Sequence, residues 1–274
     1  MVMVPFDVLI PARNEEVAIA QTAPALRQAL EGLPATVTYI LNATTDNSAD
    51  AIRQTFGTRA RIMHLETPGK AIALNRGDQA SRESTRVYLD ADVTVQPEMF
   101  RRLLAPLMDG TADLTAARLT VEAGPDGPVA RRVNRVWADQ VSRRTDVFAG
   151  CTAYGPAGLS ARGPWPNVLA DDDWARERIA PSRRRIVDAA RAQIRLPRDL
   201  TGWLAARARW IRGQRELRSL GLAGPPTPRV QPRGSLPDLG VYYAVRLAAE
   251  PVALMQHWAG VDWGRDHSSR HPDR

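Results

Sequence analysis

The sequence is poor in cysteine and lysine, and each scarcity limits what the protein does. Cys151 is the single cysteine, so neither an intramolecular disulfide nor a cysteine-based zinc cluster can form. Lys70 is the single lysine, so arginine supplies the other 36 of the 37 basic residues. We therefore expect a reducing compartment, and the lone lysine becomes a candidate functional residue.

The sequence also lacks a secretion signal and a long uninterrupted apolar run. Its N-terminus enters a strand-like segment without a charged n-region, an apolar h-region or a cleavage site. The most hydrophobic late stretch, residues 239–258, contains Arg246, Glu250 and Pro251, which are costly at the centre of a bilayer. We expect no transmembrane span and a cytoplasmic location, with peripheral contact at the inner face of the membrane as an option.

What the sequence does contain is an ordinary globular composition with an excess of positive charge. Its 274 residues are 44% hydrophobic and 24% charged, enough to form a full α/β core. The formal net charge of +7 indicates anionic partners such as nucleotide diphosphates, lipid phosphates or an anionic membrane. Tryptophans near arginines are typical of nucleic-acid binding, but core packing explains them equally well, and nucleic acid is not the expected partner.

The first hundred residues alternate short apolar runs with segments of helical periodicity, a pattern that predicts a largely parallel sheet flanked by helices. We therefore expect an α/β, Rossmann-like fold with a helical, basic C-terminal part and with loops at residues 155–166 and 224–237. The expected strands are residues 6–11, 37–41, 61–65, 86–89 and 114–121, and the expected helices are residues 15–30, 46–56, 70–80 and 97–108.

Two carboxylates on alternate residues leave the fourth expected strand. Asp90-Ala91-Asp92 follows an apolar run, and ligands of open α/β sheets bind at the carboxyl ends of the strands. Such a pair can hold a hard divalent ion, whose remaining positions go to diphosphate oxygens and water. A solvated acidic turn is the alternative reading, and the motif by itself does not exclude it.

Polar residues also follow the first three strands. Glu15 is either a ligand-binding residue or a first-turn charge that the helix dipole favours. Asp46 is suited to accept hydrogen bonds from a nucleobase, and it is equally suited to cap the helix that follows. Lys70 opens a helix, where a cation is unfavourable unless an anion lies nearby, and this indicates phosphate.

The basic second half contains an acidic cluster and an arginine-rich segment. In Asp171-Asp172-Asp173, crowded carboxylates raise one another's pKa, so one of them is a candidate general base; a helix start is the simpler reading. The stretch around Arg209 and Trp210 is either a diphosphate clamp or a solvated basic face.

Taken in order, the motifs resemble family 2 inverting glycosyltransferases of the GT-A fold over residues 6–220. VLIPARNEE is similar to the opening strand and nucleotide-binding turn of that family, and NATTDNSAD to its second aspartate motif. PGKAIALNRG resembles its Gly-Lys helix, VYLDADV its D-x-D, and FAGCTAYG its acceptor-side loop. LADDDWARERI resembles its acidic base motif, and RARWIRGQREL its (Q/R)-x-x-R-W region.

The resemblance implies a role for each matching residue. Asp172 is the implied catalytic base, with Asp173 as the second candidate because the usual Glu-Asp is replaced by three aspartates. Asp92 is the implied ligand of a Mg²⁺ or Mn²⁺ ion. The implied nucleotide-binding residues are Pro11, Ala12, Arg13, Glu15, Asp46, Lys70, Asp90 and Ala91, and the implied acceptor or donor-sugar residues are Gly150, Cys151, Asp171, Arg209 and Trp210.

The implied function is transfer of a sugar from a nucleoside-diphosphate sugar, with a UDP-sugar favoured, to a hydroxyl acceptor, either lipid-linked or a cell-envelope or polysaccharide precursor. Because glutamine is missing from the start of the last motif and no membrane spans are expected, single-sugar transfer is favoured over processive synthesis. The expected domains are residues 1–220, the GT-A domain, and residues 221–274, a loop, an amphipathic helix and a disordered tail. The alternatives are a nucleotidyltransferase, whose glycine-rich opening loop is missing here, and a non-catalytic basic module on a degenerate fold.

Overall fold

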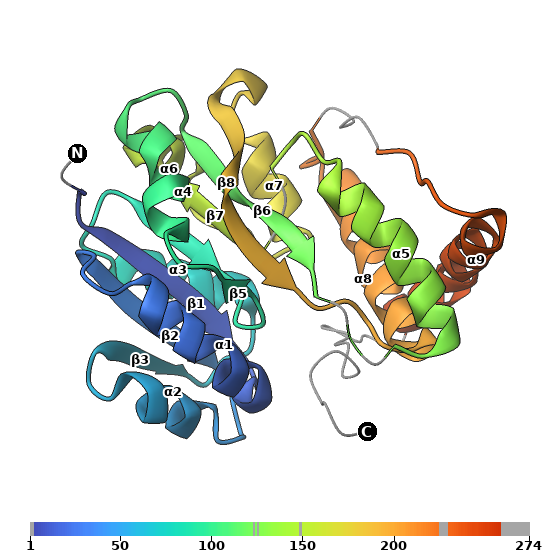
Figure 1. Ribbon diagram of the computed structural model, residues 1–274, viewed down its shortest axis with the longest axis horizontal. Helices are drawn as coiled ribbons and strands as arrows, with labels where there is room; N and C mark the ends of the chain where they lie inside the picture. The colour runs from blue at the N-terminus through green and yellow to red at the C-terminus, as the bar shows by residue number, and fades with distance from the viewer. Residues whose placement is uncertain (1–2, 123, 125, 148–149, 225–229, 259–274) are drawn as a thin grey trace. The chain divides into compact units, whose positions relative to one another are not determined.

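The computed structural model describes residues 3–122, 124, 126–147, 150–224 and 230–258 (Figure 1). It separates into two compact units. The first comprises residues 1–119, 145–167 and 171–194, and the second comprises residues 120–144, 168–170 and 195–274. The boundaries of these units do not coincide with the predicted domain boundary at residue 220. The GT-A domain of residues 1–220 stays a prediction. The expected disordered tail, residues 265–274, lies outside the described residues.

The first unit is built on a mixed eight-stranded sheet in the order β3-β2-β1-β4-β7-β6-β8-β5. Its parallel part, β3-β2-β1-β4, contains the strands expected from the apolar runs. The other part contains antiparallel pairs, β4 with β7, β7 with β6, and β8 with β5. The strands are β1 (Phe6–Ala12), β2 (Ala35–Asn42), β3 (Ala60–Leu65), β4 (Arg86–Leu89), β5 (Thr94–Val95), β6 (Leu114–Val121), β7 (Cys151–Tyr154) and β8 (Arg184–Ile194).

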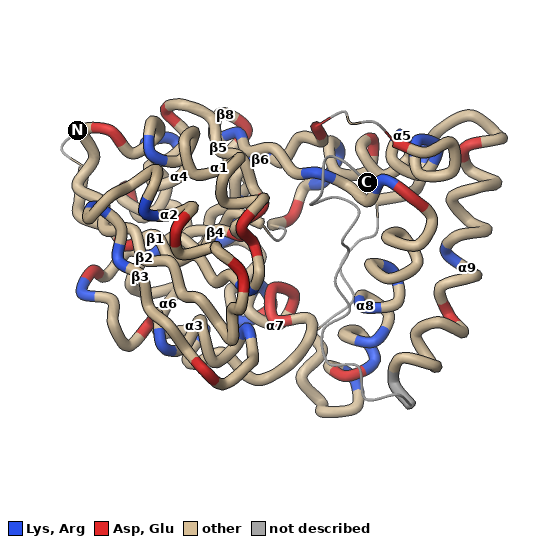
Figure 2. Tube along the Cα trace, turned by 90° about the horizontal axis from the view of Figure 1, so that it is seen from below, with Lys and Arg blue, Asp and Glu red and all other residues tan. Residues whose placement is uncertain are grey.

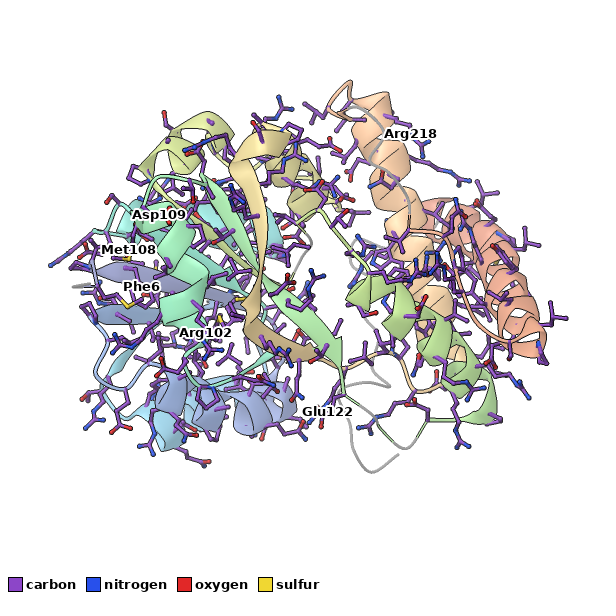
Figure 3. The ribbon with its side chains drawn as sticks, turned by 45° about the horizontal axis from the view of Figure 1, so that its top comes forward. Phe6, Arg102, Met108, Asp109, Glu122 and Arg218 are labelled. Carbon is purple, nitrogen blue, oxygen red and sulfur yellow. The ribbon has the colours of Figure 1, made fainter. Side chains whose placement is uncertain are left out.

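Helices cover both faces of this sheet. Phe6 of β1, labelled in Figure 3, packs on Phe100 of α4 with ring centroids 5.7 Å apart. Leu9 points to the opposite face and meets α3 at Gly77. A Cβ at Gly77 would come within 2.7 Å of the Ile40 side chain, so glycine permits this close approach. The helices are α1 (Glu16–Ala29), α2 (Ser48–Phe56), α3 (Lys70–Ala80), α4 (Met99–Met108), α6 (Pro156–Arg162) and α7 (Asp171–Glu177).

Two regions differ from the expectations. Residues 156–162 form α6 where a loop is expected, because Pro156 at the first helical position fits a helix start. Residues 184–194 form β8 within the half that is expected to be helical. Only two small residues of this strand are fully buried, Ala190 and Ala192, so the sequence carries no apolar alternation to indicate a strand.

The second unit is helical, as expected for the basic C-terminal part. It consists of α5 (Pro128–Ser142), α8 (Leu200–Ser219) and α9 (Leu236–Trp258), and α9 packs on both of the others. Trp137 and Trp203 are buried in its core, and the half-buried Trp210 stacks on Trp137 with ring centroids 4.9 Å apart. Within the residues that the structure describes, no helix has both the length and the apolar character of a membrane span.

Candidate active site

The carboxyl ends of the parallel strands bring the expected nucleotide-binding segments to one edge of the sheet. β1 ends at Ala12, β2 at Asn42 and β4 at Leu89, and the helix that follows β3 begins at Lys70. Parallel strands end at the same edge, which is where open α/β sheets bind ligands. The fold therefore places the turns after these strands together.

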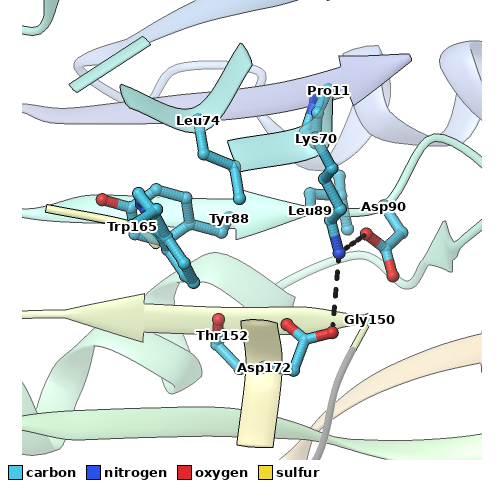
Figure 4. Close-up of a pocket in the computed structure, with 10 residues that line it drawn as sticks. All are labelled: Pro11, Lys70, Leu74, Tyr88, Leu89, Asp90, Gly150, Thr152, Trp165 and Asp172. Carbon is cyan, nitrogen blue, oxygen red and sulfur yellow. Dashed lines mark ion pairs between the residues drawn. The ribbon is translucent and has the colours of Figure 1, made fainter. Parts of the chain in front are cut away.

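Lys70 lies at the centre of a cluster of three carboxylates. Its Nζ is 3.1 Å from Asp171 Oδ2, 3.5 Å from Asp172 Oδ2 and 3.6 Å from Asp90 Oδ1. Figure 4 shows the lysine between Asp90, at the end of β4, and Asp172, at the start of α7. The D-x-D turn and the acidic cluster, 80 residues apart in sequence, thus meet across the single lysine.

The surroundings of this cluster shift the proton equilibria of its members. Burial raises the pKa of Asp172 to about 6; the attraction of Lys70 opposes this rise, while the Asp171 and Asp173 carboxylates add to it. Burial likewise raises the pKa of Asp171, against the attraction of Lys70. Burial alone would lower the pKa of Lys70, but the three carboxylates outweigh it and the pKa lies well above the usual value. Lys70 therefore stays charged, and Asp172 titrates close to neutral pH.

Asp171, Asp172 and Asp173 have different partners, which separates their possible roles. Asp171 is the most enclosed, with 6% of its side chain exposed against 35% for Asp172. Asp173 pairs with Arg176 one turn along α7, with 3.0 Å between Oδ1 and Nη1. Asp172 also lines the pocket at this edge of the sheet, and of the three it is the one best suited to accept a proton from a bound molecule.

The D-x-D turn is fixed by one backbone bond to the residue before β7 and by one within the turn. The Asp90 N–H donates to the Gly150 carbonyl at 2.9 Å, and the Val93 N–H donates to the Asp90 carbonyl at 3.1 Å. Ala91 is buried, and its carbonyl accepts from the Thr22 hydroxyl at 2.8 Å. Asp92 is partly exposed at this turn.

The turns after β1 and β2 are linked to each other through Asp46. Its Oδ2 accepts from the Glu16 N–H at 3.0 Å, and its Oδ1 accepts from the Ser48 N–H at 3.0 Å and from the Ser48 hydroxyl. The Ser48 hydroxyl oxygen in turn accepts from the Glu15 N–H at 2.9 Å. Asp46 therefore ties the start of α2 to the start of α1, but it is not the helix cap that the sequence also allowed, because α2 begins at Ser48 with Asn47 at the N-cap position. Its role toward a nucleobase stays a prediction.

The remaining predicted residues of the first unit are placed as follows. Pro11 and Gly150 line the pocket, and Arg13 is partly exposed after β1. Ala12 is buried. The Cys151 thiol faces the core, 4.0 Å from the Met99 sulfur, and burial raises its pKa to about 12. Cys151 is therefore an unreactive core residue, and only its backbone could face a ligand.

Trp165 forms a wall of the pocket that the sequence analysis missed. Its backbone N–H donates to Asn75 Oδ1 at 2.9 Å, its carbonyl accepts from Asn75 Nδ2 at 2.8 Å, and its indole N–H donates to Asp78 Oδ2 at 3.0 Å. Its ring lies 4.1 Å from the Arg162 guanidinium carbon, a cation–π contact. No local sequence motif indicates that Trp165 belongs to the site, because its partners on α3 are 90 and 87 positions away.

Arg209 and Trp210 belong to α8 of the second unit. Trp210 is half-buried and stacks on Trp137, and the Arg207 guanidinium carbon lies 5.4 Å from its ring centroid. Packing accounts for these contacts of Trp210, and its predicted role toward a sugar, like that of Arg209, stays a prediction.

The carboxylates at this edge of the sheet suit a metal ion that is bound jointly with a diphosphate better than one held by protein side chains alone. Within the described part of the chain, no three His, Cys, Asp or Glu side chains are grouped so that they could hold a metal ion. Mg²⁺ is usually bound by one or two carboxylates together with substrate phosphates and water. Asp92, with Asp90 two residues away at the same turn, matches that minimal set.

A family model supplies the identification. The model described as glycosyl transferase family 2 matches residues 7–154, which include β1, the Lys70 helix and the D-x-D turn. The chain belongs to glycosyltransferase family 2. A comparison with curated proteins gives no significant match.

Solved structures of glycosyltransferases share this fold. The mannosyltransferase PcManGT from Pyrobaculum calidifontis, in complex with GDP-Man and Mn²⁺, is 20% identical with a TM-score of 0.60, over 94% of this chain and 77% of that one. S. aureus TarS 1–349 in complex with UDP-GlcNAc is 16% identical with a TM-score of 0.54, and the match spans 70% of this chain but only 58% of TarS 1–349. At these identities the likeness establishes a GT-A fold.

Proposed function

We propose that the protein is an inverting, metal-dependent glycosyltransferase that transfers a single sugar from a nucleoside-diphosphate sugar to a hydroxyl group. The observation that carries the proposal is the meeting of Asp90, Lys70 and Asp172 at the carboxyl edge of the sheet. A UDP-sugar is the favoured donor. TarS, of the same fold, has been solved with UDP-GlcNAc and with UDP. PcManGT, solved with GDP-Man, makes a GDP-sugar the competing donor.

In this mechanism Asp172 acts as the general base. Its carboxylate accepts the proton of the acceptor hydroxyl while the hydroxyl oxygen forms a bond to the anomeric carbon. The bond between that carbon and the diphosphate oxygen breaks, and the nucleoside diphosphate leaves from the opposite face with inversion. A base with a pKa of about 6 is largely ionised at neutral pH and still accepts protons effectively.

The other residues bind and orient the donor. In the proposal, the turns after β1 and β2, with Pro11, Arg13 and Asp46, contact the nucleoside, and Lys70 places its positive charge near the diphosphate. Asp171 and Asp90 keep Lys70 in position, at 3.1 and 3.6 Å from its Nζ. Asp92 would hold a Mg²⁺ or Mn²⁺ ion, which when bound neutralises negative charge on the leaving diphosphate.

We further propose that the acceptor is lipid-linked or a cell-envelope precursor, and that the protein works in the cytoplasm at the inner face of the membrane. The net charge of +7 supports this setting, since an anionic leaflet attracts basic surfaces.

Donor hydrolysis tests the mechanism without knowledge of the acceptor, because water can replace the acceptor hydroxyl. Release of UDP from UDP-GlcNAc and of GDP from GDP-mannose would be measured with manganese present. Asp172→Asn should lower the release rate by a factor of about 10² to 10⁴ with little change in nucleotide affinity. Asp173→Asn, whose side chain pairs with Arg176, should retain most of the activity.

The matched control is Asp50→Asn, because that carboxylate forms an exposed ion pair on α2. Full turnover in both the Asp172 and the Asp173 variants would overturn the assignment of the base to this cluster.

A further inference from the structure

The outer side of α9 carries a row of large apolar side chains, which we call the α9 stripe. The exposed fractions reach 87% for Leu236, 72% for Leu247 and 71% for Met255. Most of these positions repeat at intervals of four and seven, so they lie on one side of the helix. The stripe consists of Leu236, Tyr243, Leu247, Leu254 and Met255.

The opposite side of α9 is already used for packing. Tyr242, Val245, Ala249 and Ala253 are buried, and α9 contacts both α5 and α8. A helix on the surface of a globular protein normally has one apolar side toward the core and one polar side toward water. Since α9 is apolar on both sides, its outer side lacks the polar character that a water-exposed surface usually has.

Charge is nearly missing from the outer side. Among the exposed residues described for α9, Glu250 is the only charged one, and Arg215 of α8 neutralises it at 2.6 Å. Exposed apolar patches of this kind, with a polar rim, are typical of surfaces that bind a membrane or another protein.

The charge of the chain is concentrated in the unit that carries the stripe. Residues 120–144, 168–170 and 195–258 contain 15 arginines against seven acidic residues, a formal net charge of +8. The first unit contains 19 basic and 20 acidic residues, a net charge of −1. Figure 2 shows basic positions gathered along α8, whereas α9 is mostly uncharged.

We propose that the α9 stripe is a docking surface for an anionic lipid bilayer. Leucine, tyrosine and methionine side chains enter the boundary between headgroups and acyl chains, and the arginines of the same unit attract the anionic headgroups. A second copy of the chain is the less favourable occupant, because pairing two stripes would bring two units of charge +8 together.

Vesicle cosedimentation tests the proposal. The complete protein should sediment with vesicles of phosphatidylcholine containing about one third phosphatidylglycerol, and much less with phosphatidylcholine alone. The double variant Leu247→Ser/Met255→Ser should partition at least about tenfold more weakly, because it replaces two of the most exposed apolar side chains of the stripe with polar ones. Val4→Ser, which removes an exposed apolar side chain from the first unit, is the matched control and should bind like the wild type.

Three outcomes would overturn the proposal. One is a wild-type protein that does not bind the anionic vesicles at low salt. Another is a double variant that binds the vesicles as strongly as the wild type, which would mean that the arginines alone account for vesicle binding. The third is a concentration-dependent dimer that the double variant dissociates, measured by analytical ultracentrifugation. None of the predicted nucleotide-binding residues belongs to the stripe, so nucleotide titration in solution distinguishes failure here from failure of the proposed enzymatic function.

Discussion

Replacing Lys70 with methionine would remove the one cation among three carboxylates while keeping the length of the side chain. The most enclosed carboxylate, Asp171, has an oxygen 3.1 Å from the lysine nitrogen and 6% of its side chain exposed. In the variant this carboxylate would be left buried without its cation.

The expected loss of unfolding free energy is about 2 to 3 kcal/mol near neutral pH. Breaking a buried ion pair by removing one partner costs about 3 to 5 kcal/mol. Lys70 keeps 19% and Asp172 35% of its side chain exposed, so solvent screening places the expected loss below that range.

The loss should depend on pH with a definite sign. The pKa values of Asp171 and Asp172 are raised in the folded protein, so their contribution to stability is fully present below the unfolded pKa and is lost as the pH rises through the folded pKa. Without Lys70 both pKa values rise further. The difference between wild type and variant should therefore be small near pH 4 and grow up to about pH 8.

Urea unfolding at about pH 4.5 and about pH 7.5 measures this difference. Arg53→Met is the control, because it breaks an ion pair with Asp50 whose side chains are 56% and 64% exposed, and it should cost less than about 1 kcal/mol at both pH values. An equal loss at the two pH values for Lys70→Met would refute the reasoning, since it would mean that the lysine stabilises by packing alone.

Three further predictions follow from burial and geometry. Because the pKa of Asp172 is about 6, donor hydrolysis should fall about tenfold between pH 7 and pH 5, and a flat profile would contradict its role as the base. A Cβ at Gly158 would lie 2.2 Å from a backbone oxygen, so Gly158→Ala should cost about 1 to 3 kcal/mol in urea unfolding, whereas Gly240→Ala on α9, with open space around it, should stabilise by up to about 1 kcal/mol. Trp203 is fully buried, so Trp203→Ala should lower the free energy of unfolding by about 3 to 5 kcal/mol, measured in the same way.

The parallel half of the sheet was predictable because its strands are short apolar runs followed by turns. The expected bounds of α3, β4 and β6 agree with the structure. The antiparallel half of the sheet was not predictable from the sequence. Its strand β8 pairs with β5 through residues such as Gln193 and Ala192, and the sequence of β8 does not alternate apolar and polar side chains. Its identity as a strand depends on a partner about 100 positions away.

Three members of the candidate site could be identified individually from the sequence, but their arrangement could not. Lys70, Asp90 and Asp172 were each identified from their places after strands or in an acidic cluster, and the structure brings them together. The contacts of Lys70 with Asp172 and the position of Trp165 as a wall come from tertiary packing between segments separated by roughly 90 to 100 residues, which local sequence does not encode. Asp46 was identified from its place after the second strand, but the helix starts at Ser48 with Asn47 at the N-cap, and the bond of Asp46 to the Glu16 N–H joins segments 30 positions apart.

The most direct test of the central claim, that this edge of the sheet binds a nucleoside diphosphate with a divalent ion, is calorimetric titration of UDP and GDP with and without manganese. The wild type should bind one of the two nucleotides only when the metal is present, and Asp92→Ala should abolish that binding while Asp50→Ala, on the surface of α2, leaves it intact. Failure of the wild type to bind either nucleotide, or binding that neither manganese nor Asp92 affects, would contradict the account.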